Sequence, residues 1–258
     1  LHDRPEFLLS SWNVPAVQER AAGGYPAARQ PVEELAHQRG PQDARKLEDE
    51  IARTDWTEGG SEQSLFQERR QIGKAPGFEV LLVGGVAIEG SALIARQCAE
   101  RARCLGVDEE TLATARGYLD DPGISVVRAA ALAAQTVRVH AMHDPTEGGL
   151  ATALHELAWG AQSGLAVDGQ AIPVLPACAR LCAAFGLDPL GLIASGALLV
   201  VVAPDGLPSL GAAYAQAGLP WARIARIVPR EQGLRINRAG RDLPLPRFDR
   251  DEITRVLG

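Results

Sequence analysis

The chain contains little cysteine, and the spacing of its cysteines excludes the common cysteine-based frameworks. Four cysteines occur in 258 residues, and no two of them form a CxxC pair. Two of them, Cys178 and Cys182, lie four residues apart in an apolar stretch with helical spacing, so they share one face. We therefore expect reduced, buried cysteines that pack as small hydrophobic side chains, not a disulfide framework or a metal site.

Basic charge and long hydrophobic runs are also scarce. Lysine and arginine number 26 against 32 aspartates and glutamates, for a formal net charge of -6. This balance disfavours a general nucleic-acid-binding protein, which needs a basic face. The longest apolar stretches, such as residues 193–203, are too short to span a bilayer, and no signal-peptide pattern is visible. We expect a cytoplasmic protein with neither a nucleic-acid nor a membrane partner.

The composition divides the chain into two parts. Residues 1–75 contain five spaced prolines and hardly any apolar run, which predicts an irregular or loosely docked segment. From residue 76 onward, apolar stretches typical of strands are intermixed with helical periodicities and one hairpin pattern. This mixture predicts an α+β domain over residues 76–258, with a mixed β-sheet flanked by helices.

Periodicity and turn residues give approximate bounds for the elements of this domain. We predict strands at residues 78–86, 137–142, 165–167, 197–202 and 222–228. We predict helices at residues 91–104, 108–118, 122–134, 150–161, 176–185 and 207–217, a hairpin at 233–245 and a short helix that begins near residue 249.

The most informative stretch is residues 137–161, where a predicted strand, a polar turn and a predicted helix follow one another. The start of a helix presents unpaired N–H groups and a positive dipole end to an anion. Gly148 and Gly149 would let a ligand approach the backbone closely. Asp144 and Thr146 could cap the helix, or Asp144 could hold a cation bound to phosphate. The alternative is a well-capped helix whose glycines serve close packing.

Three of the five histidines lie in this stretch. His143, beside Asp144 at the mouth of the turn, is the best candidate for a substrate-contacting or acid–base role. A zinc site is disfavoured, because His155 and Glu156 lack the second histidine of HExxH and strand alternation places His140 on the face opposite His143. We therefore expect no metal ligands, a structural His140 and a solvated Glu156.

The loop at residues 186–196 is a second candidate. Its Asp188, Ser195 and Gly196 could face the same cleft as the polar turn. The alternative is an ordinary connection from a helix to a strand. No GxSxG, Walker A or GxGxxG pattern is present to indicate another kind of site.

The residues HDPTEGGLA at 143–151 resemble the D-x-T-x-G-G motif of the aminoimidazole ribonucleotide (AIR) synthetase superfamily. The similarity is greatest to its AIR synthase-related members and to the branch of hydrogenase maturation factors. Residues 84–90, 121–126 and 187–199 support it, in the order in which that superfamily has them. The resemblance covers about residues 76–258 and corresponds to the superfamily's C-terminal domain.

The resemblance implies an ATP-dependent enzyme class in which the nucleotide lies between this domain and an N-terminal domain. ATP and Mg²⁺ are the implied cofactors, and the partner of the site is a small-molecule substrate or nucleotide. On the residues and the resemblance together, His143 and Asp144 are the candidate catalytic residues. The candidate substrate- or nucleotide-binding residues are Thr146, Glu147, Gly148, Gly149, Asp188, Ser195 and Gly196.

Two features depart from the superfamily pattern. Residues 1–75 contain no recognisable equivalent of the glycine-rich, acidic half that holds magnesium and phosphate, and residues 255–258 contain no terminal cysteine. We therefore expect little ATP turnover by this chain alone. A homodimer or a partner would supply the N-terminal domain. The alternative is a non-catalytic binding or interaction module that retains the fold.

Overall fold

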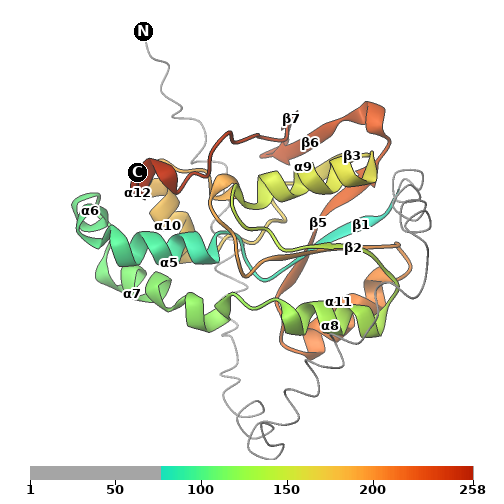
Figure 1. Ribbon diagram of the computed structural model, residues 1–258, viewed down its shortest axis with the longest axis horizontal. Helices are drawn as coiled ribbons and strands as arrows, with labels where there is room; N and C mark the ends of the chain where they lie inside the picture. The colour runs from blue at the N-terminus through green and yellow to red at the C-terminus, as the bar shows by residue number, and fades with distance from the viewer. Residues whose placement is uncertain (1–76, 258) are drawn as a thin grey trace, which may run out of the picture.

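The computed structural model of the protein describes residues 77–257. The segment predicted to be irregular, residues 1–75, lies outside the described residues. Within the described part, helices and strands are intermixed along the chain and build one sheet with helices on both sides (Figure 1). The predicted α+β class is therefore confirmed.

The sheet has seven strands in the order β2-β4-β1-β5-β3-β6-β7. Every neighbouring pair is antiparallel except β3 and β6, which are parallel, so the sheet is mixed as predicted. The strands are β1 (Glu79–Val83), β2 (Val139–His143), β3 (Gly164–Asp168), β4 (Leu198–Val202), β5 (Trp221–Val228), β6 (Leu234–Arg238) and β7 (Arg241–Pro244).

Strands β1 and β4 lie in the buried part of the sheet, because apolar residues occupy both of their faces. Val80 and Leu82 point into the larger core cluster, which includes Leu150 of the helix that follows β2. Leu81 and Val83 point into a second cluster on the other face. A strand buried on both sides requires a continuous apolar run, which is the pattern that predicted these two strands.

Helices cover both faces of the sheet. α9 completes the larger cluster, whereas α8 and α11 pack on the second one (Figure 1). None of the described helices is both long enough and apolar enough to cross a bilayer. The helices are α5 (Ile88–Gln97), α6 (Ala99–Cys104), α7 (Glu109–Gly117), α8 (Val127–Thr136), α9 (Gly149–Ala161), α10 (Pro176–Phe185), α11 (Leu207–Gln216) and α12 (Thr254–Leu257).

Three predicted helices differ from the structure, and one of them is the short C-terminal helix expected near residue 249, which begins only at Thr254. The helix expected from residue 122 begins only at Val127. Gly123 has a φ of 83°, a left-handed conformation that a right-handed helix cannot continue, and the Asp121–Pro122 peptide is cis. The helix expected over residues 91–104 begins earlier, at Ile88, and is divided at Cys98, whose φ of -119° departs from helical geometry.

The four cysteines are free thiols, as expected, but they are not all buried. Cys178 and Cys182 lie in the core with their sulfur atoms 3.9 Å apart. The hydrogen bond with Cys178, together with burial, raises the pKa of the Cys182 thiol. Cys104, by contrast, is exposed at the end of α6, so the expectation of burial is wrong for this residue.

Candidate functional site

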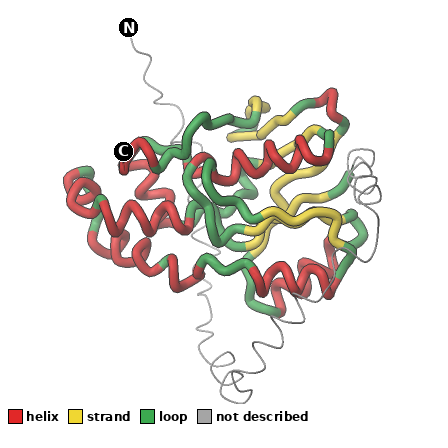
Figure 2. Tube along the Cα trace, in the orientation of Figure 1, coloured by secondary structure: helices red, strands yellow, loops and turns green. Residues whose placement is uncertain are grey.

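The segments singled out in the sequence meet at one edge of the sheet. β1 and β2 are both antiparallel to β4, so their C-terminal ends lie beside the start of β4, where Val83 and His143 pair with Leu198 and Leu199. Figure 2 shows the loops that follow and precede these strands gathered there. The amide of Ala194 donates to the carbonyl of Thr146 at 3.2 Å, which joins the two candidate loops directly.

The outer half of the turn between β2 and α9, residues 143–147, faces solvent except at Pro145. His143 Nε2 lies 2.7 Å from Glu156 Oε2, and His143 Nδ1 lies 4.0 Å from Asp144 Oδ1. The side chains of His143, Asp144 and Glu156 are 28%, 67% and 58% exposed. Glu156 is therefore accessible to solvent, as expected, but it has a specific partner that the sequence did not indicate.

The side chain of His140 was predicted to lie on the face of the strand opposite His143, but the strand is not regular at this residue. The pairing of β2 with β4 shifts register between Val139 and Ala141, so a bulge interrupts the strand at His140. The ring of His140 lies 4.3 Å from the ring of Phe78, which packs against the same core cluster as α9. This contact supports the structural role expected for His140.

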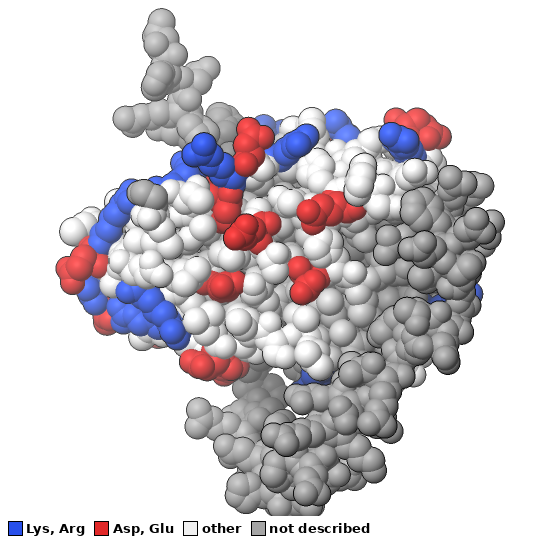
Figure 3. All heavy atoms as spheres, in the orientation of Figure 1, with Lys and Arg blue, Asp and Glu red and all other residues white. Residues whose placement is uncertain are grey.

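The charge around the outer half is acidic. Residues 143–149 carry Asp144 and Glu147 but no lysine or arginine, and Glu156 adds a third exposed carboxylate. On this face of the molecule, acidic side chains lie in the middle, whereas the basic ones that are visible lie toward the edges (Figure 3). Among the described residues, no group of three or more His, Cys, Asp or Glu side chains could hold a metal ion. The exposed carboxylates of this surface thus offer hydrogen-bond acceptors.

The inner half of the turn, Gly148 and Gly149, is already bound by the protein itself. The amide of Gly148 donates to Asp251 Oδ2 at 2.7 Å, and Asp251 Oδ1 accepts from the amides of Ile193 at 3.2 Å and Ile253 at 2.8 Å. A carboxylate from the C-terminal segment therefore lies at the start of α9, the position expected for a ligand anion. The predicted caps Asp144 and Thr146 are wrong, because neither side chain caps this helix.

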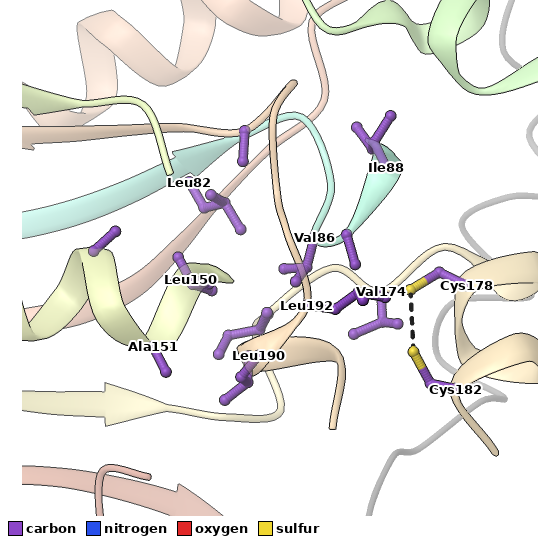
Figure 4. Close-up of a cluster of buried hydrophobic side chains, with 14 of the residues drawn as sticks. Leu82, Val86, Ile88, Leu150, Ala151, Val174, Cys178, Cys182, Leu190 and Leu192 are labelled. Carbon is purple, nitrogen blue, oxygen red and sulfur yellow. Dashed lines mark hydrogen bonds between the residues drawn. The ribbon is translucent and has the colours of Figure 1, made fainter. Parts of the chain in front are cut away.

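Gly149 provides close packing at the start of α9. A Cβ atom at this position would lie 2.5 Å from the carbonyl oxygen of Leu190 and 2.7 Å from that of Leu192. Its φ of 67° is also left-handed. Figure 4 shows Leu190 and Leu192 beside Leu150 in the core. These contacts fit the alternative in which the glycines serve close packing, because the loop at residues 190–192 approaches the backbone of Gly149.

Gly196 lies where three loops cross. A Cβ atom on Gly196 would lie 2.8 Å from the carbonyl oxygen of Gly123, and one on Gly84 would clash with the carbonyl oxygen of Gly196. Both glycines have left-handed φ values, 98° for Gly196 and 86° for Gly84. Ser195, directly before this crossing, is partly exposed. The structure therefore brings Ser195 and Gly196 to the same edge of the sheet as the polar turn, and their role in binding stays a prediction.

Asp188 is engaged within the fold. Its carboxylate forms an ion pair of 2.9 Å with Arg238, and the two side chains are only 10% and 8% exposed. Asp188 Oδ1 also accepts from the amide of Leu190, which caps the short 3-10 helix Pro189–Gly191. The backbone amide of Asp188 donates to Glu252 of the C-terminal segment at 3.0 Å. A ligand-binding role for Asp188 stays a prediction that these contacts disfavour.

Asp251 and Glu252 are the residues of this region that sequence reasoning missed. The available signal was acidic residues near the predicted C-terminal helix, and these fit the first turn of that helix equally well. Both carboxylates instead reach back to the loop at residues 188–193. Their partners lie 58 to 103 residues away in the sequence, so no local pattern could identify them.

Comparisons with known proteins give the same family as the sequence motifs. The family model described as AIR synthase related protein, C-terminal domain, matches residues 75–236, more than half of the chain. The carbamoyl dehydratase HypE of Rhizobium leguminosarum bv. viciae is 32% identical over 138 residues, which cover 54% of this chain and 36% of that protein. The HypE of Cupriavidus necator is 32% identical over 154 residues, covering 60% and 40%.

Solved structures share the fold. The crystal structure of E. coli HypE has a TM-score of 0.57 at 24% sequence identity and covers 70% of this chain and 53% of that one. A HypE structure in complex with ATP has a TM-score of 0.50 at 21% identity and covers 69% and 53%. This chain thus spans well under two thirds of the length of each of these relatives. From the matched family model and these relatives, we conclude that the chain belongs to the AIR synthase-related family and contains its C-terminal domain.

Proposed function

We propose that this domain forms the substrate-facing wall of an ATP-dependent enzyme that activates a small molecule. The observation that carries the proposal is the meeting of the family's motif loops at one edge of the sheet, with Asp144 exposed and His143 partly exposed there. The similarity to carbamoyl dehydratases and to a HypE solved with ATP supports the enzyme class. Thr146, Glu147 and Ser195 are the neighbouring groups proposed to contact the substrate.

The residues of this wall do not fit the phosphates of ATP. The amide of Gly148 is taken by Asp251, and the exposed charged side chains at the turn are carboxylates, which repel phosphate. The described residues also lack a cluster that could hold Mg²⁺. ATP and Mg²⁺ would therefore be held by groups outside the described residues, in a second half that faces this wall. We propose that a homodimer, a partner or a further part of a longer chain supplies that half, in the cytoplasm.

Calorimetry tests whether ATP and Mg²⁺ are bound by the second half and not by this domain alone. ATP with Mg²⁺ is titrated into the protein alone, and then into the protein mixed with the N-terminal domain of a HypE relative. We expect weak binding and little hydrolysis alone, and tighter binding with turnover in the mixture. Asp144→Ala should lower the turnover of the mixture, whereas Glu231→Ala, on an exposed turn remote from the site, should not. Robust hydrolysis by the protein alone, lost in Asp144→Ala, would contradict the proposal.

A second candidate is a non-catalytic binding module that retains the fold. The observation that favours it is Asp251, which already occupies the helix start expected to receive a ligand anion. On this alternative, Asp144→Ala changes neither ATP binding nor turnover in the mixture. The same titrations therefore distinguish the two functions.

A further inference from the structure

We propose that His143 and Glu156 form a proton-accepting dyad on this wall, in which Glu156 positions the imidazole and Nδ1 of His143 accepts a proton from an O–H or N–H group of the substrate. The inference rests on the proposed function, because it gives a chemical role to the site already described. Glu156 is the new residue. It lies on α9, 13 positions after His143, and the sequence had placed it in solvent without a partner.

The contact between the two side chains fixes the position of the ring proton. The separation of 2.7 Å between His143 Nε2 and Glu156 Oε2 is in the range of a charge-assisted hydrogen bond. An ionised carboxylate can only accept, so the proton of this bond belongs to Nε2. In the neutral ring, the lone pair is then on Nδ1. Carboxylates orient histidines in this way in many catalytic sites.

The free nitrogen faces the candidate site. His143 Nδ1 and Asp144 Oδ1 are 4.0 Å apart, which is too far for a direct hydrogen bond. A substrate amino or amide NH2 group at roughly 2.8 Å from each atom could donate one hydrogen to Nδ1 and the other to Oδ1. His143 is partly exposed and Asp144 mostly exposed, so such a group can reach both atoms.

The proposed step breaks one bond of the substrate and forms one N–H bond on His143. The proton leaves the substrate atom and forms the Nδ1–H bond, while the electron pair stays on the substrate atom and makes it a nucleophile. The new imidazolium lies between the carboxylates of Glu156 and Asp144. The other ionisable side chains between residues 143 and 156 are Glu147 and His155. His155 is directed elsewhere, with Nε2 3.1 Å from the carbonyl oxygen of Pro246.

Stability alone does not account for the pair. Both side chains are partly solvated, and ion pairs of this kind contribute little to folding. A matched acid, Glu147, lies on the same turn. Glu147→Gln therefore provides a control that removes one negative charge from the turn without removing the acceptor at Nε2.

Nuclear magnetic resonance of the ¹⁵N-labelled full chain tests the dyad without a substrate. His143→Gln identifies the ring signals of His143. We expect a downfield, exchange-protected Nε2–H proton and an unprotonated Nδ1 in the wild type when the ring is neutral. Glu156→Leu should abolish the protected proton, and Glu147→Gln should retain it. Glu156→Gln, whose amide oxygen can still accept, should restore part of the protection that leucine removes.

The outcomes separate this inference from the function on which it rests. A ring proton on Nδ1, or a protected signal that survives in Glu156→Leu, overturns the dyad regardless of nucleotide binding. If the dyad signals are as expected but the mixture with the HypE domain neither binds nor hydrolyses ATP, the proposed enzyme function fails while the geometry of the pair stands. If turnover occurs, the dyad requires Glu156→Leu to reduce it with a changed pH profile, and an unchanged profile contradicts it.

Discussion

In the turn between β2 and α9, the inner half is bound by the rest of the protein, whereas the outer half is open. Gly148 donates to Asp251, and Gly149 is packed under the loop at residues 190–192. One to five residues earlier, Asp144, Thr146 and Glu147 are exposed. The residues of one short motif thus divide between holding the fold and facing solvent. A sequence motif can therefore identify a site without showing which of its residues are available.

Because the inner half is bound by the rest of the protein, we expect substitutions around it to lower the unfolding free energy, whereas substitutions in the outer half should not. The largest effect is expected for Asp188→Ala, in the loop that packs on the inner half. It leaves the buried guanidinium of Arg238 without its carboxylate, which should cost about 3–5 kcal/mol of unfolding free energy. Urea denaturation measures this. Asp242→Ala, which breaks the exposed pair with Arg235, should cost less than about 1 kcal/mol.

Gly149→Ala should have the next largest effect. The new Cβ would meet the carbonyl oxygens of Leu190 and Leu192, and the left-handed φ disfavours alanine, so we expect a loss of about 2–4 kcal/mol. The control lies in the same helix. A Cβ on Gly160 meets open space, and Gly160→Ala should stabilise α9 by roughly 0.5–1 kcal/mol. If Gly149→Ala and Gly160→Ala lowered the unfolding free energy equally, close packing at Gly149 would not explain its effect.

Asp251→Ala should destabilise the protein by about 2 kcal/mol, because three backbone amides lose their acceptor. Amide hydrogen exchange should locate the effect, with faster exchange at Gly148 and Ile193. Asp249→Ala, at a nearby exposed acid, should leave both rates unchanged. If Asp251→Ala exchanges like the wild type, Asp251 does not hold the inner half in place.

The smallest effect on stability is expected in the outer half. Glu156→Gln and His143→Gln should each change the unfolding free energy by no more than about 0.5 kcal/mol, since both side chains are partly solvated. Thermal unfolding of the two variants beside the wild type measures this. A loss as large as that of Asp251→Ala would show that the outer half also holds the fold, and the contrast between the halves would fail.

Much of the fold follows from local patterns. The apolar runs predict β1 and β4, and the helix expected at residues 176–185 has the bounds observed for α10, with Pro176 at its start and Gly186 after its end. The breaks at Cys98 and Gly123 were missed because the apolar periodicity continues through them. Periodicity reports which face of an element is buried, but it does not report where the backbone leaves the helical conformation.

The candidate site was predictable only in part. The sequence placed the polar turn and the loop at residues 186–196 together, and the antiparallel pairing of β4 with β1 and β2 does bring them to one edge. It did not predict that Asp188 pairs with Arg238, or that a bulge changes the position of His140. These contacts join residues 50 positions apart or depend on strand register, neither of which local spacing contains.

The sequence by itself determined the family, the α+β class and the position of the motif, because these depend on residue types at fixed short separations. Only the tertiary structure decided which residues of the motif are bound within the fold and which are exposed. It brought Asp251 to Gly148 across 103 residues and Glu156 to His143 across 13. The backbone path sets which charges meet at the turn, so the start of α9 carries an internal carboxylate and the histidine beside it acquires a partner.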